Sequence, residues 1–161
     1  MTILSGRNYE YAIINNFFTE ANPLNRSAII DGFTFTEGNF WYGGAIGNLY
    51  SSPIITNCIF VNNLGYYGAI GNVDFSTPLI KNCTFKENIG NNSVAGIHDS
   101  AGSNSEIINC TFRDNQGSGV RVEYNSSTYI ANCTFYNNTN TWTGGAIDIF
   151  DKTSSPLIVN C

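Results

Sequence analysis

One repeated word restricts this chain to folds that are built from stacked copies of a single unit. The word is Asn-Cys-x-Phe-x-x-Asn, and its complete copies span 57–63, 82–88, 109–115 and 132–138. A variant begins at Asp31, and the chain ends inside a further copy that begins at Asn160. From Phe35 onward, the phenylalanines of the word follow one another at steps of 25, 25, 27 and 23 residues. A unit of this length cannot bury its apolar side alone, so successive copies must pack against each other.

Two further words interleave with the first. The glycine word, Gly-Gly-Ala-Ile or a close variant, ends at an aliphatic residue in each copy: Ile46, Ile70, Ile97, Val120 and Ile147. The proline word places an apolar pair after Pro53, Pro78 and Pro156, while Ser105 and Thr128 take the proline position in the two middle copies. Each period therefore holds three apolar segments of at most about five residues, a length that favours strands over helices.

Three short strands per period, stacked like upon like, predict an all-β fold. We expect a right-handed parallel β-helix of about six coils with three parallel sheets. The strands of one coil are called here the glycine strand, the proline strand and the cysteine strand, after their words. Residues 1–161 are expected to form a single domain of this kind. Because the chain begins within a strand word and stops inside a copy, we also expect it to be a piece of a longer solenoid.

Successive side chains of a strand point to opposite faces, which predicts the residues that fill the interior. The Cys and Phe of each cysteine strand lie two residues apart and should both face inward, in two columns. The Asn that precedes each Cys should bend the chain, and its side chain should hydrogen-bond to the equivalent Asn of the next coil. Neighbouring cysteines would have parallel Cβ vectors about 4.8 Å apart, which favours free thiols over a disulfide framework. A linear column also cannot converge on a tetrahedral metal ion, so no metal site is predicted.

The charge balance excludes some partners. The chain has 7 Lys and Arg against 12 Asp and Glu, a formal net charge of −5. A basic surface for nucleic acid is therefore not expected. No apolar run approaches the roughly 18–20 residues that a membrane span requires.

The repeat words resemble those of a known family. Phe-x-x-Asn together with Gly-Gly-Ala-Ile is similar to the repeat pair of the polymorphic outer-membrane proteins, which are surface adhesins. The wider resemblance is to right-handed parallel β-helix repeat proteins of the pectin-lyase-like superfamily, and it covers nearly the whole chain. The segments Thr2–Gly6 and Ala28–Thr34 are similar to the first coils of large bacterial secreted members. The glycine word departs from the family pattern at 94–97 and 117–120.

This resemblance implies two classes of function. The first is a non-catalytic, secreted or cell-surface (outer-membrane) scaffold for adhesion or carbohydrate contact, whose partner would be a polysaccharide or a host or cell-surface protein. The second is part of a polysaccharide lyase or glycoside hydrolase. Paired carboxylates in register would favour an enzyme. The sequence does not supply them, so no catalytic residue and no cofactor is assigned, and the scaffold is preferred.

A row of polar residues on the glycine strands is the first candidate binding site. The residue after each inward aliphatic residue should point outward, which places His98, Arg121 and Asp148 on consecutive coils at intervals of about 4.8 Å. Such a row could bind an acidic sugar or shuttle a proton. The alternative is a solvated surface with an Arg121–Asp148 ion pair of little energetic value. On the earlier coils the same row holds Gly47 and Gly71, which should leave a bare face that could admit a flat sugar ring.

A group of aromatic residues before the glycine strands is the second candidate. Trp41, Tyr66 and Trp142, with Tyr42 and Tyr67 beside them, each lie three to five residues before an inward aliphatic residue. Exposed rings along one edge could form a platform for sugar rings or a partner protein. Alternatively, the rings pack on each other and shield the sheet edge.

Overall fold

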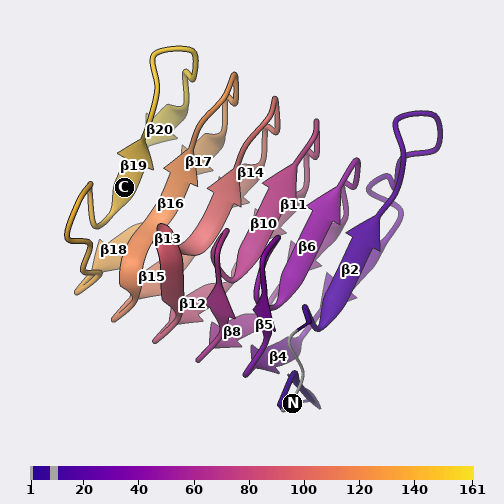
Figure 1. Cartoon of the computed structure of the whole chain (residues 1–161), viewed down its shortest axis with the longest axis horizontal. Helices are drawn as coiled ribbons and strands as arrows, with labels where there is room; N and C mark the ends of the chain where they lie inside the picture. The colour runs from indigo at the N-terminus through magenta and orange to yellow at the C-terminus, as the bar shows by residue number, and fades with distance from the viewer. Residues whose placement is uncertain (1, 8–10) are drawn as a thin grey trace.

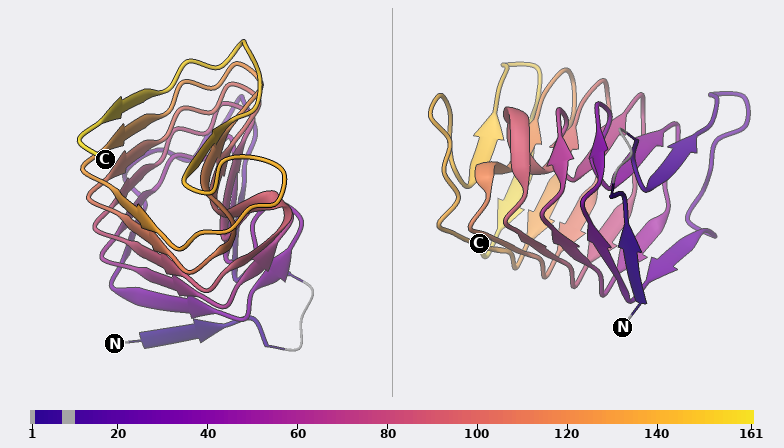
Figure 2. Two further views of the ribbon diagram at one scale, coloured as in Figure 1. Left: turned by 90° about the vertical axis from the view of Figure 1, so that its left-hand side faces the viewer. Right: turned by 60° about the horizontal axis from the view of Figure 1, so that its bottom comes forward.

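The computed structural model describes residues 2–7 and 11–161, so residues 1 and 8–10 of the predicted domain lie outside the described part. The side chains of residues 92 and 93 are likewise not described. The described chain contains strands and turns but no helix, and hence no helix that could cross a membrane. Its strands form three parallel sheets (Figure 1), which confirms the predicted all-β parallel helix. Seen end-on, the coils lie one upon another around a common interior (Figure 2).

The cysteine sheet has the order β1-β4-β8-β12-β15-β18. Its strands are Thr2–Ser5 (β1), Phe33–Thr36 (β4), Ile59–Val61 (β8), Thr84–Lys86 (β12), Thr111–Arg113 (β15) and Thr134–Tyr136 (β18).

The glycine sheet has the order β19-β16-β13-β10-β6-β2, and two short strands, β5 and β9, join it beside β13. Its strands are Ile14–Phe17 (β2), Asn39–Phe40 (β5), Ile46–Leu49 (β6), Leu64–Gly65 (β9), Ile70–Val73 (β10), Ile89–Asp99 (β13), Gln116–Val122 (β16) and Ile147–Ile149 (β19).

The proline sheet has the order β20-β17-β14-β11-β7-β3. Its strands are Ile29–Asp31 (β3), Ile54–Thr56 (β7), Leu79–Lys81 (β11), Glu106–Ile108 (β14), Tyr129–Ala131 (β17) and Leu157–Val159 (β20). Within the described residues each sheet thus takes one main strand from each of six coils. Coil 1 comprises β1–β3, coil 2 β4–β7, coil 3 β8–β11, coil 4 β12–β14, coil 5 β15–β17 and coil 6 β18–β20.

A column of stacked phenylalanines fills the interior beside the cysteine sheet. Its ring centroids lie 4.7–5.0 Å apart with planes within 7° of parallel. The members are Phe35, Phe60, Phe85, Phe112 and Phe135, as the repeat predicts. The inward aliphatic residues of the other two sheets and the column of buried cysteines complete a continuous core.

Three ladders of polar side chains run along the stack. The predicted asparagine ladder is present at the bends before the cysteine strands, where the side chain of Asn82 donates a hydrogen bond to that of Asn57 at 3.3 Å. All asparagines of this ladder have φ of 51–54°. Asparagine tolerates this left-handed conformation, which accounts for its place in the word. A second ladder is buried and uses the last Asn of each word, as in the 3.2 Å bond from Asn88 to Asn115. A third lies on the inner face of the glycine sheet and ends at the buried carboxyl of Asp99.

The five cysteines are free, as predicted, with four buried in the column and Cys161 exposed. Each buried thiol donates to the carbonyl two residues earlier, for example Cys83 to Lys81 at 3.2 Å. The thiols therefore act as small apolar groups with a local hydrogen bond.

A reductant is expected to leave the melting temperature unchanged, because no disulfide constrains the stack. Thiol titration should find only Cys161 reactive in the folded protein and all five cysteines reactive after unfolding. A single reactive thiol in the unfolded, non-reduced chain would contradict the free-thiol column.

Candidate functional site

The predicted row of polar residues lies in register on the outer face of the glycine sheet. Gly71 is paired with His98, His98 with Arg121, and Arg121 with Asp148. The expectation of a solvated row is wrong, however: His98 is 0 %, Arg121 5 % and Asp148 7 % exposed. The side chains are covered by aromatic rings and hold one another in a compact cluster.

Glu123 is the centre of this cluster. Its Oε1 atom lies 2.9 Å from Nε2 of His98. Its Oε2 atom accepts a 3.0 Å hydrogen bond from Nε of Arg121. Arg121 Nε is also 3.6 Å from Asp148 Oδ2, and its guanidinium lies 4.1 Å from the centroid of the Phe150 ring. The guanidinium of Arg121 therefore lies against both carboxylates of the cluster.

Electrostatics at the cluster follow from burial and pairing. Burial alone would raise the pKa of Glu123, but His98 and Arg121 together hold it below its ordinary value. Burial raises the pKa of the Tyr67 hydroxyl, and the nearby negative charge of Glu123 adds to this effect. The Tyr67 ring packs on His98 with centroids 4.5 Å apart. Glu123 is thus held ionised beside a neutral phenol that closes one side of the cluster.

The sheet face at Gly47 and Gly71 is covered by other parts of the protein, contrary to the expectation from the sequence. A Cβ at Gly71 would lie 1.9 Å from the carbonyl oxygen of Tyr42, and one at Gly47 would lie 3.1 Å from the Phe17 ring. Glycine is needed at position 71 because the backbone of the protein's own loop approaches the sheet closely there. A flat sugar ring has no space on this face.

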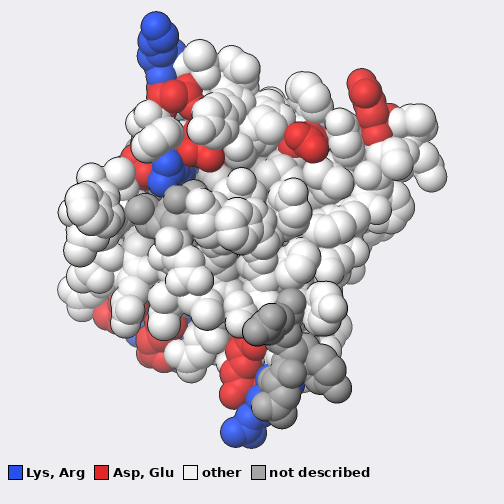
Figure 3. Space-filling model, in the orientation of Figure 1, with Lys and Arg blue, Asp and Glu red and all other residues white. Residues whose placement is uncertain are grey.

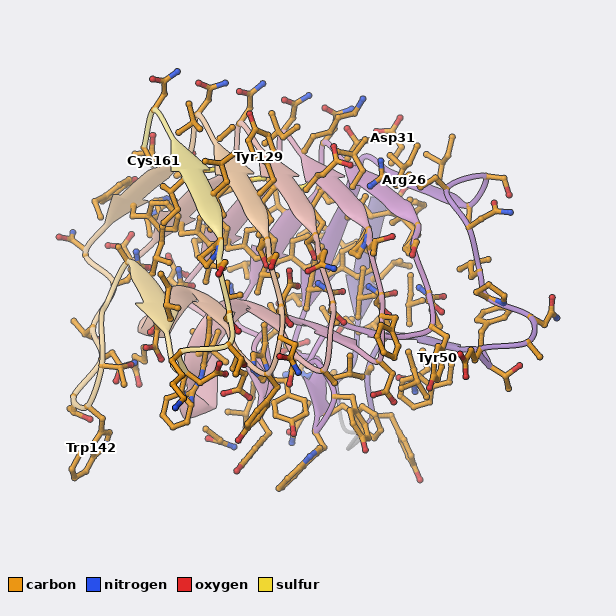
Figure 4. The ribbon with its side chains drawn as sticks, turned by 90° about the horizontal axis from the view of Figure 1, so that it is seen from above. Arg26, Asp31, Tyr50, Tyr129, Trp142 and Cys161 are labelled. Atoms are coloured by element: carbon orange, nitrogen blue, oxygen red, sulfur yellow. The ribbon has the colours of Figure 1, made fainter. Side chains whose placement is uncertain are left out.

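The predicted aromatic residues do not form one group. Trp41 and Tyr66 stack with centroids 3.8 Å apart, and Tyr67 packs against both. Trp41 nevertheless remains half exposed. Trp142 is 87 % exposed and lies on coil 6, where no described ring packs on it. Figure 4 shows its indole projecting away from the ribbon.

A cleft opens beside Trp142, where the connection between the cysteine and glycine strands is short. Eight residues separate Phe112 from Val120 in coil 5, whereas the corresponding Phe and Ile are 12 residues apart in both coil 4 and coil 6. The short connection leaves a gap of about 410 Å³ between its neighbours. Its floor is Gln116 and Gly117, one wall is formed by Gly90 and Asn91, and the other by residues 139–142. This gap is called the coil-5 cleft.

The lining of the coil-5 cleft is uncharged and rich in amides and hydroxyls. The side chains of Asn91 and Gln116 are exposed and make no hydrogen bond with the described residues. Figure 3 shows one face of the molecule as mostly uncharged, with acidic and basic atoms near the ends of β16 and β19, further acidic atoms at the upper right, and both kinds along the lower edge. No three His, Cys, Asp or Glu side chains in the described part gather closely enough to hold a metal ion. The cleft therefore suits hydrogen-bonding, uncharged ligands.

Sequence reasoning identified the row and Trp142 but missed the coil-5 cleft. The sequence does contain a feature that predicts the cleft, namely the unequal number of residues between the Phe of the cysteine strand and the aliphatic residue of the glycine strand. A short connection between two longer ones must leave a gap. The contact of Glu123 with His98 and Arg121 was also not predicted, although Glu123 lies two residues after Arg121 on the same outer face.

Comparison with known families agrees with this architecture. Residues 86–161 match the family described as right handed beta helix region. Together with the three parallel sheets, this match shows that the chain has the right-handed parallel β-helix fold. Placement in the pectin-lyase-like superfamily is consistent with both observations. No curated protein and no solved structure matches the chain.

Proposed function

We propose that this protein is a non-catalytic β-helix scaffold that contacts carbohydrate through the coil-5 cleft. The observation that carries the proposal is the exposed indole of Trp142 at the wall of an uncharged, amide-lined cleft. Aromatic faces pack well on the apolar faces of sugar rings, while amides bond to hydroxyl groups. Following the resemblance of its repeats, the scaffold would be secreted or surface-exposed and would serve adhesion or polysaccharide contact.

The available chemistry favours an uncharged glycan over an acidic one. Arg121, the cation that the sequence offered to a sugar carboxylate, is buried and lies against Glu123 and Asp148. Recruiting it would leave two buried carboxylates without their cation, a costly exchange. The exposed amides of Asn91 and Gln116 carry no such penalty.

Replacement of Trp142 by Ala is expected to lower affinity for an uncharged oligosaccharide at least about tenfold, equivalent to about 1.4 kcal/mol. The reason is that the indole supplies the main apolar surface of the cleft. Calorimetric titration against a panel of uncharged and acidic oligosaccharides measures this effect.

Tyr136→Ala provides the matched control, since Tyr136 is an exposed ring on β18 outside the cleft. Its binding curve should coincide with that of the unmodified chain. Equal affinity of the Trp142→Ala variant and the unmodified chain would remove the cleft as the contact site.

A second candidate, a polysaccharide-active enzyme, is favoured by one observation. His98 is fully buried, its Nδ1 has no hydrogen-bond partner in the described structure, and its Nε2 faces Glu123. A histidine beside a carboxylate can act as a general base. Incubation of polysaccharides with the unmodified chain and with Glu123→Gln distinguishes the candidates, since only an enzyme releases chain ends in a Glu123-dependent manner.

A further inference from the structure

Three aromatic residues occupy a backbone conformation that bulky side chains avoid. Tyr50, Phe75 and Tyr124 have φ of 48°, 59° and 52°, in the bends between the glycine and proline strands. Such bends favour Gly or Asn, and at the position of Phe75 coils 4 and 5 have Gly102 and Asn125, with φ of 76° and 62°, while Tyr124 lies one residue before Asn125. An aromatic residue at this position departs from local preference and needs a compensating reason.

Burial does not supply that reason for Phe75. The residue is 65 % exposed, although one edge of its ring rests against Gly102, where a Cβ would lie 2.8 Å from Cε1. The contact with Gly102 fixes the ring but leaves most of it in solvent. Unfavourable local conformations that persist without burial tend to gather at binding sites.

The rings of Tyr50 and Phe75 wall a cavity of about 260 Å³. Their centroids are 6.4 Å apart with planes inclined by 31°. Glu20 and Pro23, from the loop between β2 and β3, and Ser52 complete the lining. Figure 4 shows Tyr50 beside this loop, at the end of the stack opposite Trp142. The cavity is therefore separate from the coil-5 cleft.

The loop that carries Glu20 and Pro23 is fixed in place. Asn22 N–H donates to the Thr19 carbonyl at 3.0 Å, which closes a tight turn around Glu20. Leu24 N–H donates to the Tyr50 carbonyl at 3.1 Å, and Ser52 N–H donates to the Leu24 carbonyl at 2.8 Å. The acidic side of the cavity is thus tied directly to its aromatic side.

Glu20 is the one charged residue in the lining, and its carboxylate has no hydrogen-bond or ion-pair partner in the described structure. Aromatic faces attract cations through the ring quadrupole, and an adjacent carboxylate adds to that attraction. An apolar wall with one uncompensated negative charge selects a cation with an apolar body. The volume fits a group of the size of one side chain.

We propose that this cavity binds an organic cation of the alkylammonium class. The group is carried either by a lysine side chain of a partner protein or by a free quaternary amine. In either case the aromatic rings accept the apolar methyl or methylene groups and Glu20 neutralises the charge. The site is independent of the carbohydrate contact proposed above.

Titration of the full chain with tetramethylammonium and with a capped lysine, followed by NMR, tests the proposal. We expect saturable binding of at least one cation, and at least tenfold weaker binding of tert-butanol, the uncharged counterpart of tetramethylammonium. Binding of the capped lysine would identify a partner's side chain as the occupant, whereas binding of tetramethylammonium alone would identify a free amine. Absence of saturable binding by both cations, or equal binding of tert-butanol, overturns the proposal.

Variants separate binding from folding. Phe75→Asn and Glu20→Gln should each weaken cation binding at least tenfold. Phe75→Asn should keep or raise the melting temperature, because Asn adopts the observed φ readily. Tyr124→Asn is the matched control, since it has the same backbone conformation outside the cavity, and it should leave cation binding unchanged. A lower melting temperature of Phe75→Asn with unchanged cation binding would show that the ring serves only packing.

Discussion

Replacement of Phe85 by Ala is expected to lower the free energy of unfolding by about 3–5 kcal/mol. Phe85 is fully buried in the middle of the phenylalanine column, between Phe60 at 4.7 Å and Phe112 at 4.8 Å. Removing its ring leaves a void between two parallel rings that the backbone ladders above and below hold apart. Urea unfolding followed by circular dichroism measures the change.

The loss should depend on the position along the stack. In a repeat protein each coil is stabilised mainly by its two neighbours, so a ring at the end of the column contributes less. Phe135 is less buried than Phe85, and its replacement by Ala should cost less. The exposed Tyr136 should change the free energy of unfolding by no more than about 0.5 kcal/mol when replaced by Ala. Equal losses for Phe85→Ala and Tyr136→Ala would contradict a packed phenylalanine column.

The repeat words were sufficient to predict the sheets and the interior. Each word combines a strand with a bend, and the period-two alternation within a strand determines which residues face inward. Phe85 and Cys83 are therefore placed correctly by their spacing alone. The bend residue Asn82 is equally predictable, because its left-handed conformation recurs in every copy.

Exposure on the outer faces could not be predicted in the same way. It depends on the loops between the words, whose lengths and sequences vary from coil to coil. Tyr67 covers His98, and the Tyr42 carbonyl covers Gly71, although neither relation is part of a repeated word. The row was thus placed in the correct register, but its burial was not foreseen.

The third ladder shows a further limit. Asn48, Asn72 and Asp99 face the interior two residues after an inward Ile, where the pattern alone suggests an apolar residue. They remain inside because their side chains hydrogen-bond to one another along the stack. Asn48 donates to Asn72, and Asn72 donates to Asp99, each at 2.8 Å. Burial nevertheless raises the pKa of Asp99, even though Thr128, Asn72 and Ser105 donate to its carboxyl. Satisfied polar ladders of this kind become visible only once the register is known.

Replacement of Arg121 by Ala is expected to lower the free energy of unfolding by about 3–5 kcal/mol at neutral pH. The sequence alone suggested the opposite outcome, a surface change that leaves the fold intact. The structure reverses the expectation because Arg121 lies between the buried carboxylates of Glu123 and Asp148. Without the guanidinium both charges stay buried, and only His98 remains beside Glu123.

The pH dependence of this loss is specific to the cluster. The pKa of Glu123 is lowered in the folded protein, so its contribution to stability is present above its ordinary value of 4.5 and is lost as the pH falls through the folded pKa. Arg121 is one cause of the lowered pKa, and its removal should therefore cost most at neutral pH and progressively less in acid. Urea unfolding of Arg121→Ala at pH values on both sides of that range measures the difference. Lys152→Ala, at an exposed basic residue on coil 6, should show no such loss at any pH. If Arg121→Ala instead matched the unmodified chain at neutral pH, the guanidinium would contribute nothing to the fold, and the acidic-glycan site expected from the sequence would again be open to it.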